Sequence, residues 1–416
     1  MPLCYSRMER TLGNLEAILD KRTALATQVI HAGRAVETAN LLPSSPPIHS
    51  AVTYRYPHST TLDAVLSGRA EGFAYRRLGS PTVDCLEGAL AELEGTESAV
   101  ACQSGMAALH LALLAAGANP TIAVLAADDL YGGTHALLTE VFAAQGANVV
   151  FGDLTDLHSV SQLLEQIHAR VIVAETFSNP LLKVCDLPAL AQLAHSVGAR
   201  IVVDNTFATP VLYRPALDGA DYVVHSATKY LSGHGDILAG IVAASGTELQ
   251  KVRGLQQTIG HVIDPAQAWL LLRSLRTLVL RMRQHCANAL GVARFLCGHQ
   301  RVTQVHYPGL PSSPHFALAR RLFPSDMYGG VVSFEIREAE EEQVFRFMDA
   351  LKLVSPATSL GDVGSLVLYP WNSSHRSLSA EAKLALGIGR GLVRLSVGIE
   401  DASDIISDLG QALEQA

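Results

Sequence analysis

The stretch Asp221-Tyr-Val-Val-His-Ser-Ala-Thr-Lys229 decides how this sequence folds and where its chemistry lies. Its first half is an apolar run, typical of a buried strand, and its end places Lys229 in a loop. An earlier apolar run, Ile201-Val-Val203, indicates a second buried strand that ends at Asp204. Open α/β sheets bind ligands at the carboxyl ends of their strands. The sequence therefore predicts that Lys229 and Asp204 meet at one edge of a sheet.

Two hydroxyl side chains, Ser226 and Thr228, lie close to Lys229 in this loop. Pyridoxal phosphate requires a lysine for a Schiff base, an acid for its pyridinium nitrogen and donors for its phosphate. Each residue also has an ordinary structural explanation, because loop lysines are commonly solvated and Asp, Ser and Thr near turns commonly bond local backbone. The spacing alone therefore makes pyridoxal phosphate a hypothesis that needs support from other residues.

Further segments of the chain, taken in order, resemble the signature of a known family. They are Tyr75-Arg-Arg77-Leu-Gly-Ser-Pro81-Thr82, Ser104-Gly105-Met106, Tyr131-Gly-Gly133-Thr134, Glu175-Thr-Phe-Ser-Asn179-Pro180, Val203-Asp204-Asn205-Thr206, Ser226-Ala-Thr-Lys229-Tyr230-Leu-Ser-Gly233-His234, Tyr307-Pro-Gly309-Leu310, Ser359-Leu-Gly361 and Val393-Arg394-Leu395-Ser396-Val397-Gly398-Ile399-Glu400. From about Thr27 to its C-terminus the chain resembles the Cys/Met-metabolism family, the pyridoxal-phosphate enzymes of trans-sulfuration. That family includes cystathionine γ-synthase, cystathionine γ- and β-lyases, methionine γ-lyase and O-acylhomoserine sulfhydrylases.

The resemblance implies an α/β fold of the aminotransferase-like fold-type I and a role for each signature residue. Lys229 would hold the cofactor aldehyde and, once released, move protons on the substrate. Asp204 would pair with the pyridine nitrogen and keep the ring protonated, so that the ring accepts electrons. Tyr131 would stack on the ring and assist proton transfer at the leaving group. Asn179 would donate to the 3′ oxygen of the cofactor and help to seat the substrate.

The phosphate is expected at the start of a helix predicted over Met106–Ala116. A helix N-terminus offers free N–H groups and the positive end of its dipole, which suit a phosphate. An N-cap serine followed by a flexible glycine is the structural alternative. With the resemblance, the expected phosphate ligands are Ser104, Gly105, Met106, Ser226 and Thr228. The resemblance adds Tyr75 and Arg77, which in the family reach the phosphate of the neighbouring subunit and so imply a homo-oligomer, expected to be a tetramer of two active dimers.

Arg394 lies in the apolar run Leu392-Val-Arg-Leu-Ser-Val397, which would bury its guanidinium group. Buried arginines are nearly always paired, and the guanidinium fork matches the α-carboxylate of an amino acid. A structural ion pair with Glu400 is the alternative. The resemblance favours substrate binding by Arg394, with the Ser359 backbone, Asn179 and Tyr75 as further substrate contacts. Two histidines near the signature segments are interpreted as packing or hydrogen-bonding residues outside catalysis, namely His234 and His375.

The expected reaction is γ-replacement or γ-elimination on a homoserine- or methionine-type amino acid. Family members that act on cystathionine often carry Glu before the Ser-Leu-Gly segment, where this chain has Thr358. Methionine γ-lyases usually have Cys at the position of Gly133, whereas Asp362 resembles the lyases. The segment Trp371-Asn-Ser-Ser-His-Arg376 also departs from the commoner Met-Thr-His pattern. A cystathionine γ-synthase or a carbon–sulfur γ-lyase is the preferred form, an O-acylhomoserine sulfhydrylase is close behind, and a non-catalytic cofactor-binding protein of assembly or regulation is more remote.

Composition restricts the alternatives for the 416-residue chain. The net charge of −8, without a clear basic cluster, argues against a nucleic-acid partner. Its apolar stretches are shorter than the ~20 residues of a membrane helix, and Met1–Arg10 lacks the apolar segment of a signal peptide, so we expect a cytoplasmic protein without a membrane partner. The six cysteines show neither a CxxC pair nor a zinc spacing. No metal is therefore expected. Most of the cysteines, such as Cys185 and Cys297, have apolar neighbours in sequence, so they are expected to be buried structural thiols.

The order of apolar runs predicts three regions. Residues 1–80 would form an N-terminal extension, with a short helix around Leu12–Lys21, and an intersubunit arm. Residues 81–265 alternate strands and helices and predict a mostly parallel, seven-stranded sheet that binds the cofactor. The expected strands are Ala99–Cys102, Thr121–Ala126, Asn148–Phe151, Val171–Glu175, Arg200–Asp204, Tyr222–His225 and Leu238–Ala243, and the helices include Val83–Leu93, Met106–Ala116, Thr134–Ala144 and Leu187–Val197.

Residues 266–416 predict a smaller α+β domain. It would begin with one long or kinked helix over Ala266–Cys297, because this segment is apolar and rich in Leu and Arg. The expected strands are Val302–Tyr307, Gly330–Ile336 and Leu392–Val397, and the expected helices are His315–Leu322, Glu340–Ala350 and Ala402–Glu414.

Overall fold

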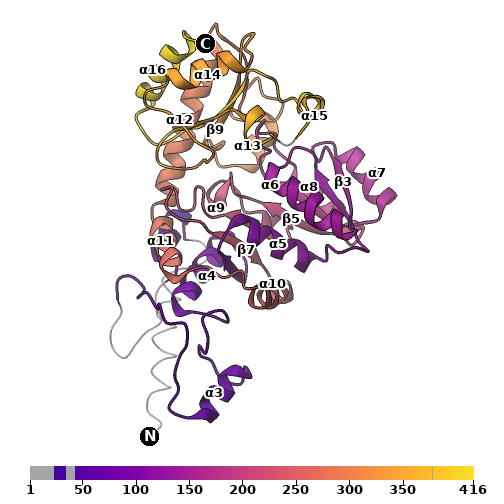
Figure 1. Ribbon diagram of the computed structural model, residues 1–416, viewed down its shortest axis with the longest axis vertical. Helices are drawn as coiled ribbons and strands as arrows, with labels where there is room; N and C mark the ends of the chain where they lie inside the picture. Colours follow the sequence, from indigo (N-terminus) through magenta and orange to yellow (C-terminus); the bar gives the residue numbers. More distant parts are fainter. Residues whose placement is uncertain (1–22, 34–42, 377) are drawn as a thin grey trace.

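A computed structural model describes residues 23–33, 43–376 and 378–416 of the chain. Two sheets with their helices form the body, and an arm that carries helix α3 extends from it at the bottom of Figure 1. The large sheet lies in the centre of the view. The smaller sheet lies above it with helices α12 (Leu278–Gly298), α14 (Glu341–Ala350) and α16 (Ala402–Leu413). The short helix expected at Leu12–Lys21 falls outside the described residues.

The large sheet has seven strands in the order β1-β7-β6-β5-β4-β2-β3. Strand β7 pairs antiparallel with β1 and β6, whereas the pairs among β2 to β6 are parallel. This arrangement confirms the predicted fold class, and the strand ends differ from the predicted ones by at most two residues. The strands are β1 Ser98–Cys102, β2 Ala123–Ala127, β3 Asn148–Gly152, β4 Ala169–Glu175, β5 Arg200–Asp204, β6 Tyr222–Ser226 and β7 Gly240–Ala244.

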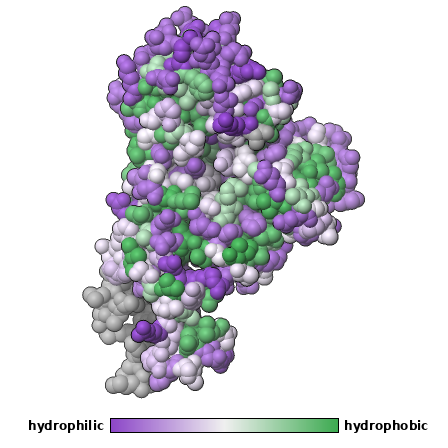
Figure 2. Space-filling model, viewed as in Figure 1, coloured by the Kyte–Doolittle hydropathy of each residue, from purple (hydrophilic) through white to green (hydrophobic). Residues whose placement is uncertain are grey.

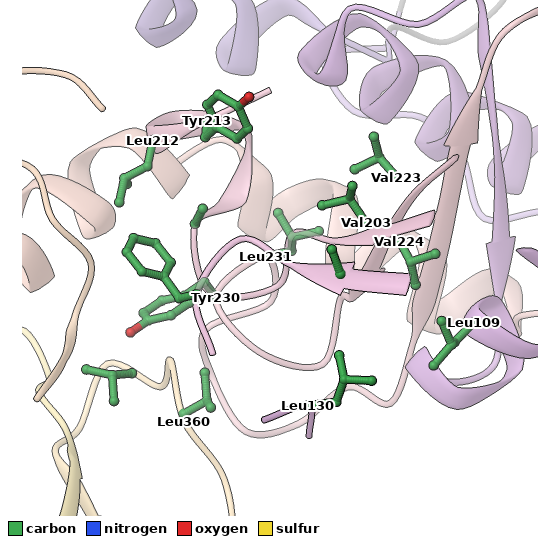
Figure 3. Close-up of a cluster of buried hydrophobic side chains, with 14 of the residues drawn as sticks. Leu109, Leu130, Val203, Leu212, Tyr213, Val223, Val224, Tyr230, Leu231 and Leu360 are labelled. Carbon is green, nitrogen blue, oxygen red and sulfur yellow. The ribbon is translucent and has the colours of Figure 1, made fainter. Parts of the chain in front are cut away.

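Strands β4 to β6 form because their apolar side chains are covered on both faces, as expected for parallel strands. Val203 of β5 and Val223 and Val224 of β6 are fully buried. Figure 3 shows them in one cluster with Leu109 of helix α5 (Gly105–Ala116). The helices of this part of the chain are α4 Pro81–Glu94, α5 Gly105–Ala116, α6 Gly132–Ala136, α7 Leu157–Ile167, α8 Leu187–Ser196, α9 Thr209–Leu212 and α10 Gly246–Ile259.

The segment predicted as one helix over Thr134–Ala144 is more irregular in the structure. Helix α6 continues into a π-helical turn, Leu137–Phe142, and then a 3₁₀ turn, Ala143–Gln145. The predicted helix over Ala266–Cys297 is likewise two helices, α11 Pro265–Leu275 and α12 Leu278–Gly298, separated at Arg276 and Thr277. The apolar pattern continues across both breaks, so the sequence did not locate them.

The second sheet has five strands in the order β10-β11-β12-β9-β8. Strand β12 carries Arg394 and pairs with β9 and β11, which puts this arginine in the interior of the sheet. The division of the chain into regions at residue 265 stays a prediction. The elements are β8 Val302–His306, α13 Phe316–Leu322, β9 Val331–Ile336, α14 Glu341–Ala350, β10 Ser355–Pro356, β11 Leu366–Leu368, α15 Ala380–Ala385, β12 Leu392–Ser396 and α16 Ala402–Leu413.

The arm, which we define as residues 43–80, has little of its own chain to pack against. Its helix α3, Ser59–Leu66, has no buried residue, and several apolar side chains of the arm are exposed. Figure 2 shows apolar surface on the arm below the body. The preceding short helix, α2 Leu25–His31, packs instead on α4 and α12. The exposed apolar side chains of the arm are Ile48, Val52, Leu66, Tyr75 and Leu78.

Three single features can be described within the residues that the structure covers. Here, no helix is long and apolar enough to cross a membrane. Cys102, Cys185 and Cys286 are buried as expected, but Cys297 is exposed, because it lies in the last turn of α12 on the side facing solvent. The burial predicted for Cys297 from its apolar neighbours is therefore wrong. No group of three or more His, Cys, Asp or Glu that could hold a metal ion occurs among these residues.

Candidate active site

A cavity of about 210 Å³ opens at the carboxyl ends of β4, β5 and β6 and is closed on one side by the second sheet. Polar residues predicted from widely separated segments meet in it. The predicted residues that line the cavity are Ser104, Gly105, Met106, Tyr131, Asn179, Asp204, Ser226, Thr228, Lys229 and Arg394.

Asp204 lies at the end of β5 and is partly buried, with its carboxylate at the cavity. Its Oδ1 accepts hydrogen bonds from the Thr206 backbone N–H at 2.9 Å and from Thr206 Oγ1 at 2.5 Å. Burial raises the pKa of Asp204, while the Thr206 donors and the nearby His225 act in the opposite direction. A buried carboxylate of this kind is stabilised by a cation brought into the cavity, and a protonated pyridine nitrogen would supply that charge.

Lys229 follows β6 and points its ammonium group at the second sheet. Nζ donates to Ser359 Oγ at 3.1 Å. Burial and the neighbouring Arg394 guanidinium lower the pKa of Lys229, while Asp362 partly opposes them. An amine with a lowered pKa is a better nucleophile towards an aldehyde at neutral pH, because more of it is unprotonated.

Helix α5 begins against the sheet, and two glycines make this approach possible. A Cβ on Gly105 would lie 2.7 Å from Ser226 Cβ, and a Cβ on Gly240 would lie 2.0 Å from the Ser104 carbonyl oxygen. Ser104 is also a true N-cap, since its Oγ accepts from the Ala107 N–H at 3.1 Å. The first N–H groups of α5 thus border the cavity, where an anion would be stabilised.

Thr228 is held by its own chain as well as lining the cavity. Its hydroxyl donates to the Ala239 carbonyl at 3.2 Å and accepts from the Ala239 N–H at 3.0 Å. Ser226 is positioned differently, because its N–H donates to Thr206 Oγ1 at 2.8 Å and its side chain faces Gly105. The Thr228 hydroxyl and the Ser226 backbone are therefore held in place by contacts within the chain.

Arg394 is buried without a carboxylate partner among the described residues. Nη1 donates to Asn179 Oδ1 at 3.0 Å, Nη2 donates to the Ser359 carbonyl at 3.1 Å, and Nε has no partner there. The alternative ion pair with Glu400 is absent, since that carboxylate accepts from the Ser365 N–H and hydroxyl. Burial lowers the pKa of Arg394 to about 10. An uncompensated buried guanidinium is costly, so this arrangement favours an anionic ligand.

Tyr131 stands at the mouth of the cavity and is 45% exposed. Its N–H donates to Glu175 Oε1 at 2.8 Å, which fixes the turn before α6. Gly133 leaves room for the ring, because a Cβ there would lie 2.5 Å from Tyr131 Cε1. The exposed ring is therefore placed where it can cover a flat ligand.

Sequence reasoning assigned no role to Glu175, although it belongs to a signature segment. It is in register with Asp204 on the neighbouring strand and lines the same cavity. Burial and the nearby Asp204 raise the pKa of Glu175 well above its ordinary value, which favours the neutral acid. Its position one strand away from Asp204, also at a strand end, was the available signal. The other lining residues that were not singled out are mainly apolar, namely Leu109, Phe177, Phe207, Leu238 and Leu360.

Tyr75 and Arg77 do not line the cavity of their own chain. Both belong to the arm, where Arg77 donates to the Gln257 carbonyl and lies over the Tyr75 ring with 5.8 Å to its centroid. Their predicted contact with the cofactor phosphate of a neighbouring subunit stays a prediction. Of the two histidines set aside, His234 bonds the Ser232 carbonyl through Nδ1 at 2.6 Å, and His375 is buried with Nδ1 2.9 Å from Ser374 Oγ.

Comparison with known proteins agrees with the family resemblance of the signature segments and extends it over nearly the whole chain. A family model described as "Cys/Met metabolism PLP-dependent enzyme" matches residues 26–414. An L-methionine gamma-lyase from Pseudomonas putida is 40% identical over 95% of this chain and 98% of its own length.

Two solved structures cover the chain to a similar extent. A cystathionine gamma synthase from Xanthomonas oryzae pv. oryzae, in complex with cystathionine, is 38% identical with a TM-score of 0.88 over 94% of this chain and 98% of that one. A putative O-acetylhomoserine (thiol)-lyase from Campylobacter jejuni, which carries N'-pyridoxyl-lysine-5'-monophosphate, is 29% identical with a TM-score of 0.89 over 94% of this chain and 100% of that one.

Proposed function

The chain belongs to the Cys/Met-metabolism family of pyridoxal-phosphate-dependent enzymes, and we propose that it catalyses γ-replacement or γ-elimination on homoserine- or methionine-type amino acids. The observation that carries the proposal is Arg394, whose buried guanidinium contacts only neutral groups among the described residues and faces the cavity that holds Lys229 and Asp204. An α-carboxylate is the ligand that this guanidinium fork fits best.

The residues of the cavity fit pyridoxal phosphate as a set. We assign the pyridine nitrogen to Asp204, the phosphate to Ser226, Thr228 and the first turn of α5, and the aldehyde to Lys229. The bound cofactor supplies an electron sink that stabilises negative charge at the substrate Cα. Lys229 Nζ, with its lowered pKa, then takes the Cα proton and returns protons to the substrate skeleton.

The substrate would be held by its carboxylate while the γ-substituent leaves. Arg394 binds the carboxylate, and Asn179 and the Ser359 carbonyl hold the guanidinium plane in place. Tyr131 covers the reacting atoms, excludes water and donates a proton to the departing γ-substituent. Glu175 Oε1 accepts a hydrogen bond from the Tyr131 backbone N–H and so holds this part of the backbone in place.

The reaction within the family is proposed from the uncharged wall of the cavity. Thr358, Leu360 and Leu238 line it and offer no acid for a second ammonium group. This wall is better suited to a γ-substituent such as a thioether or an ester than to the distal amino-acid part of cystathionine. We prefer a γ-synthase or a carbon–sulfur γ-lyase. An O-acylhomoserine sulfhydrylase is the second candidate, supported by the same wall and by the likeness to the Campylobacter jejuni protein.

The exposed apolar side chains of the arm support an active homo-oligomer. Ile48, Val52 and Leu66 lie on the arm, whose helix α3 buries none of its residues, and Tyr75 and Arg77 belong to the same arm. We propose that a second copy covers the arm and receives Tyr75 and Arg77 at its own cavity. A tetramer of two such dimers is the expected assembly.

A substrate panel tests the proposed reaction. Methionine, cystathionine, cysteine and O-acetyl- and O-succinylhomoserine would each be incubated with and without added cysteine or sulfide, and the products identified by mass spectrometry. A 2-oxo acid indicates elimination, and a new thioether or homocysteine indicates replacement. Lys229→Ala should form neither, whereas Lys183→Ala, a lysine ion-paired with Asp129 outside the cavity, should keep both activities.

The covalent attachment is tested separately. Borohydride reduction of the holoenzyme, followed by digestion, should attach the cofactor to the peptide that contains Lys229. A label on another lysine would overturn the assignment of the site. A correctly labelled protein that converts none of the substrates would favour the remoter alternative, a cofactor-binding protein without turnover.

A further inference from the structure

Behind the active site, a second row of polar side chains crosses the ends of β4, β5 and β6. Glu175 and Asp204 are in register and line the cavity. Thr176 and Asn205 each follow one of these acids, and the register of β5 with β6 places His225 beside Asn205. Because successive residues of a strand point to opposite faces, these three side chains turn away from the cavity.

Hydrogen bonds join this second row into one network with the last residue of α4, Glu94. Thr176 Oγ1 donates to Asn205 Oδ1 at 2.7 Å, and Asn205 Nδ2 donates to the Tyr213 carbonyl at 2.9 Å and to Glu94 Oε1 at 3.5 Å. His225 Nε2 lies 2.5 Å from the same Glu94 oxygen. The side chains of Glu94, Asn205, His225 and Thr176 are all at most 1% exposed.

The chemistry assigned to the cavity does not use this buried acid and base. A fully buried carboxylate is destabilising unless it is paired and hydrogen-bonded. Glu94 Oε1 accepts from the amide N–H₂ of Asn205 and lies against Nε2 of the His225 imidazole, so one carboxylate oxygen joins both side chains. The contact thus links an acid at the end of α4 to a base on β6, the strand next to Asp204.

The position of His225 matters for Asp204. His225 lowers the pKa of Asp204 against the effect of burial, whereas Glu175, on the other neighbouring strand, is an acid whose ionisation would raise it. Asp204 is therefore flanked by a base on β6 and by an acid on β4. The ionised form of Asp204 depends on which neighbour bears charge.

We propose that Glu94 and His225, with Asn205 and Thr176, are positioning residues that hold the end of β5 in place and keep the Asp204 carboxylate ionised for the ring nitrogen of the cofactor. This inference rests on the proposed placement of the cofactor at Asp204. The network acts from the opposite face of the sheet and touches neither cofactor nor substrate.

Two pairs of variants separate positioning from ordinary stability. Glu94→Gln removes the charge that polarises His225 while keeping the shape of the side chain. Glu87→Gln is the matched control, because Glu87 is a buried acid on the same helix whose partner is Arg253, with 2.6 Å between Oε2 and Nη2. Thr176→Val removes the hydroxyl that bonds Asn205, and Thr176→Ser restores it.

Two measurements on the cofactor itself report the state of Asp204. The first is the dissociation constant of pyridoxal phosphate from the apoprotein, and the second is the ¹⁵N NMR shift of ring-labelled cofactor in the holoenzyme. We expect Glu94→Gln to weaken binding about tenfold, the equivalent of a change of about one pKa unit at Asp204, and to move the ¹⁵N shift towards the unprotonated ring. Thr176→Val should change both in the same direction by less, while Thr176→Ser and Glu87→Gln should match the wild type.

Each of the other outcomes contradicts either the role of the network or the proposed cofactor site. If Glu94→Gln and Thr176→Val lower the unfolding temperature as Glu87→Gln does but leave both cofactor measurements at wild-type values, the network is only structural and the proposal is wrong. If Glu94→Gln does not fold, the two Thr176 variants decide alone. If instead the wild type does not protonate the bound ring, or Asp204→Asn leaves the ¹⁵N shift unchanged, the proposed site fails rather than the network.

Discussion

Replacing Arg394 with methionine should separate a substrate-binding arginine from a structural one. The α-carboxylate would receive two charge-assisted hydrogen bonds from the guanidinium fork, each worth about 1.5–3 kcal/mol. Their loss amounts to about 3–6 kcal/mol, and kcat/KM should fall by about 10²- to 10⁴-fold. Most of this loss should appear in KM if the carboxylate is bound equally in the ground state and the transition state.

Stability should respond differently from activity. Arg394→Met removes a buried charge, which relieves a desolvation cost of several kcal/mol. It also leaves Asn179 Oδ1 and the Ser359 carbonyl unpaired, at a cost of about 1–3 kcal/mol each. Because these effects oppose one another, the unfolding midpoint of the apoprotein should stay within about 4 °C of the wild type.

The assay compares the best amino-acid substrate with its carboxamide, which lacks the negative charge. The wild type should prefer the acid strongly, and Arg394→Met should lose most of this preference. Arg281→Met is the matched control, since Arg281 is equally buried but donates to the carbonyls of Tyr230, Leu231 and Ser274. It should destabilise the protein and keep the preference. An Arg394→Met protein that still prefers the acid, or that unfolds as early as Arg281→Met, would refute the reasoning.

Three further predictions follow from the same contacts. Because the Arg394 charge lowers the pKa of Lys229, the unprotonated amine appears at lower pH in the wild type; Arg394→Met should move the acid limb of the kcat/KM–pH profile to higher pH, and an unmoved limb would exclude this coupling. Gly133→Ala should displace the Tyr131 ring and lower kcat by about 10²-fold or more with little change in stability, as steady-state kinetics and thermal unfolding would show. Mixing inactive Arg77→Ala and Lys229→Ala chains under exchange should restore activity if each site draws these residues from two chains, and no recovery in verified mixed dimers would place Arg77 outside the neighbouring site.

The strands and the two residues that define the site could be predicted because their signal is local. An apolar run such as Ile201–Val203 is buried on both faces, and the polar residue that ends it must lie at the edge of the sheet. Lys229 and Asp204 follow from this alone. The substrate role of Arg394 needed the family resemblance, since burial of an arginine in an apolar strand is compatible with any anionic partner.

The remaining features depend on contacts between distant segments. Glu94 ends a helix like many other acids, and its partner His225 lies on a strand far along the chain, so neither residue shows its role in sequence. The break between α11 and α12 falls at Arg276 and Thr277 within a continuous apolar pattern. Cys297 has apolar neighbours in sequence but lies in the last turn of α12, where one side of the helix is uncovered.

The charged groups of the cavity have few partners of opposite charge within the chain. The expected cofactor and amino-acid substrate would supply those partners. Burial raises the pKa of Glu175 and of Asp204 and lowers the pKa of Lys229 and of Arg394, so the charged form of each group would be stabilised by a ligand of opposite charge. Within the described residues, Arg394 has no carboxylate to neutralise it, and Asp204 has only the hydroxyl and N–H of Thr206 as direct donors. In the proposed site, a protonated ring nitrogen would pair with Asp204 and an α-carboxylate would pair with Arg394. Asp204 would thus select the cofactor ring and Arg394 the substrate carboxylate, and Lys229, which lines the same cavity, would move the proton.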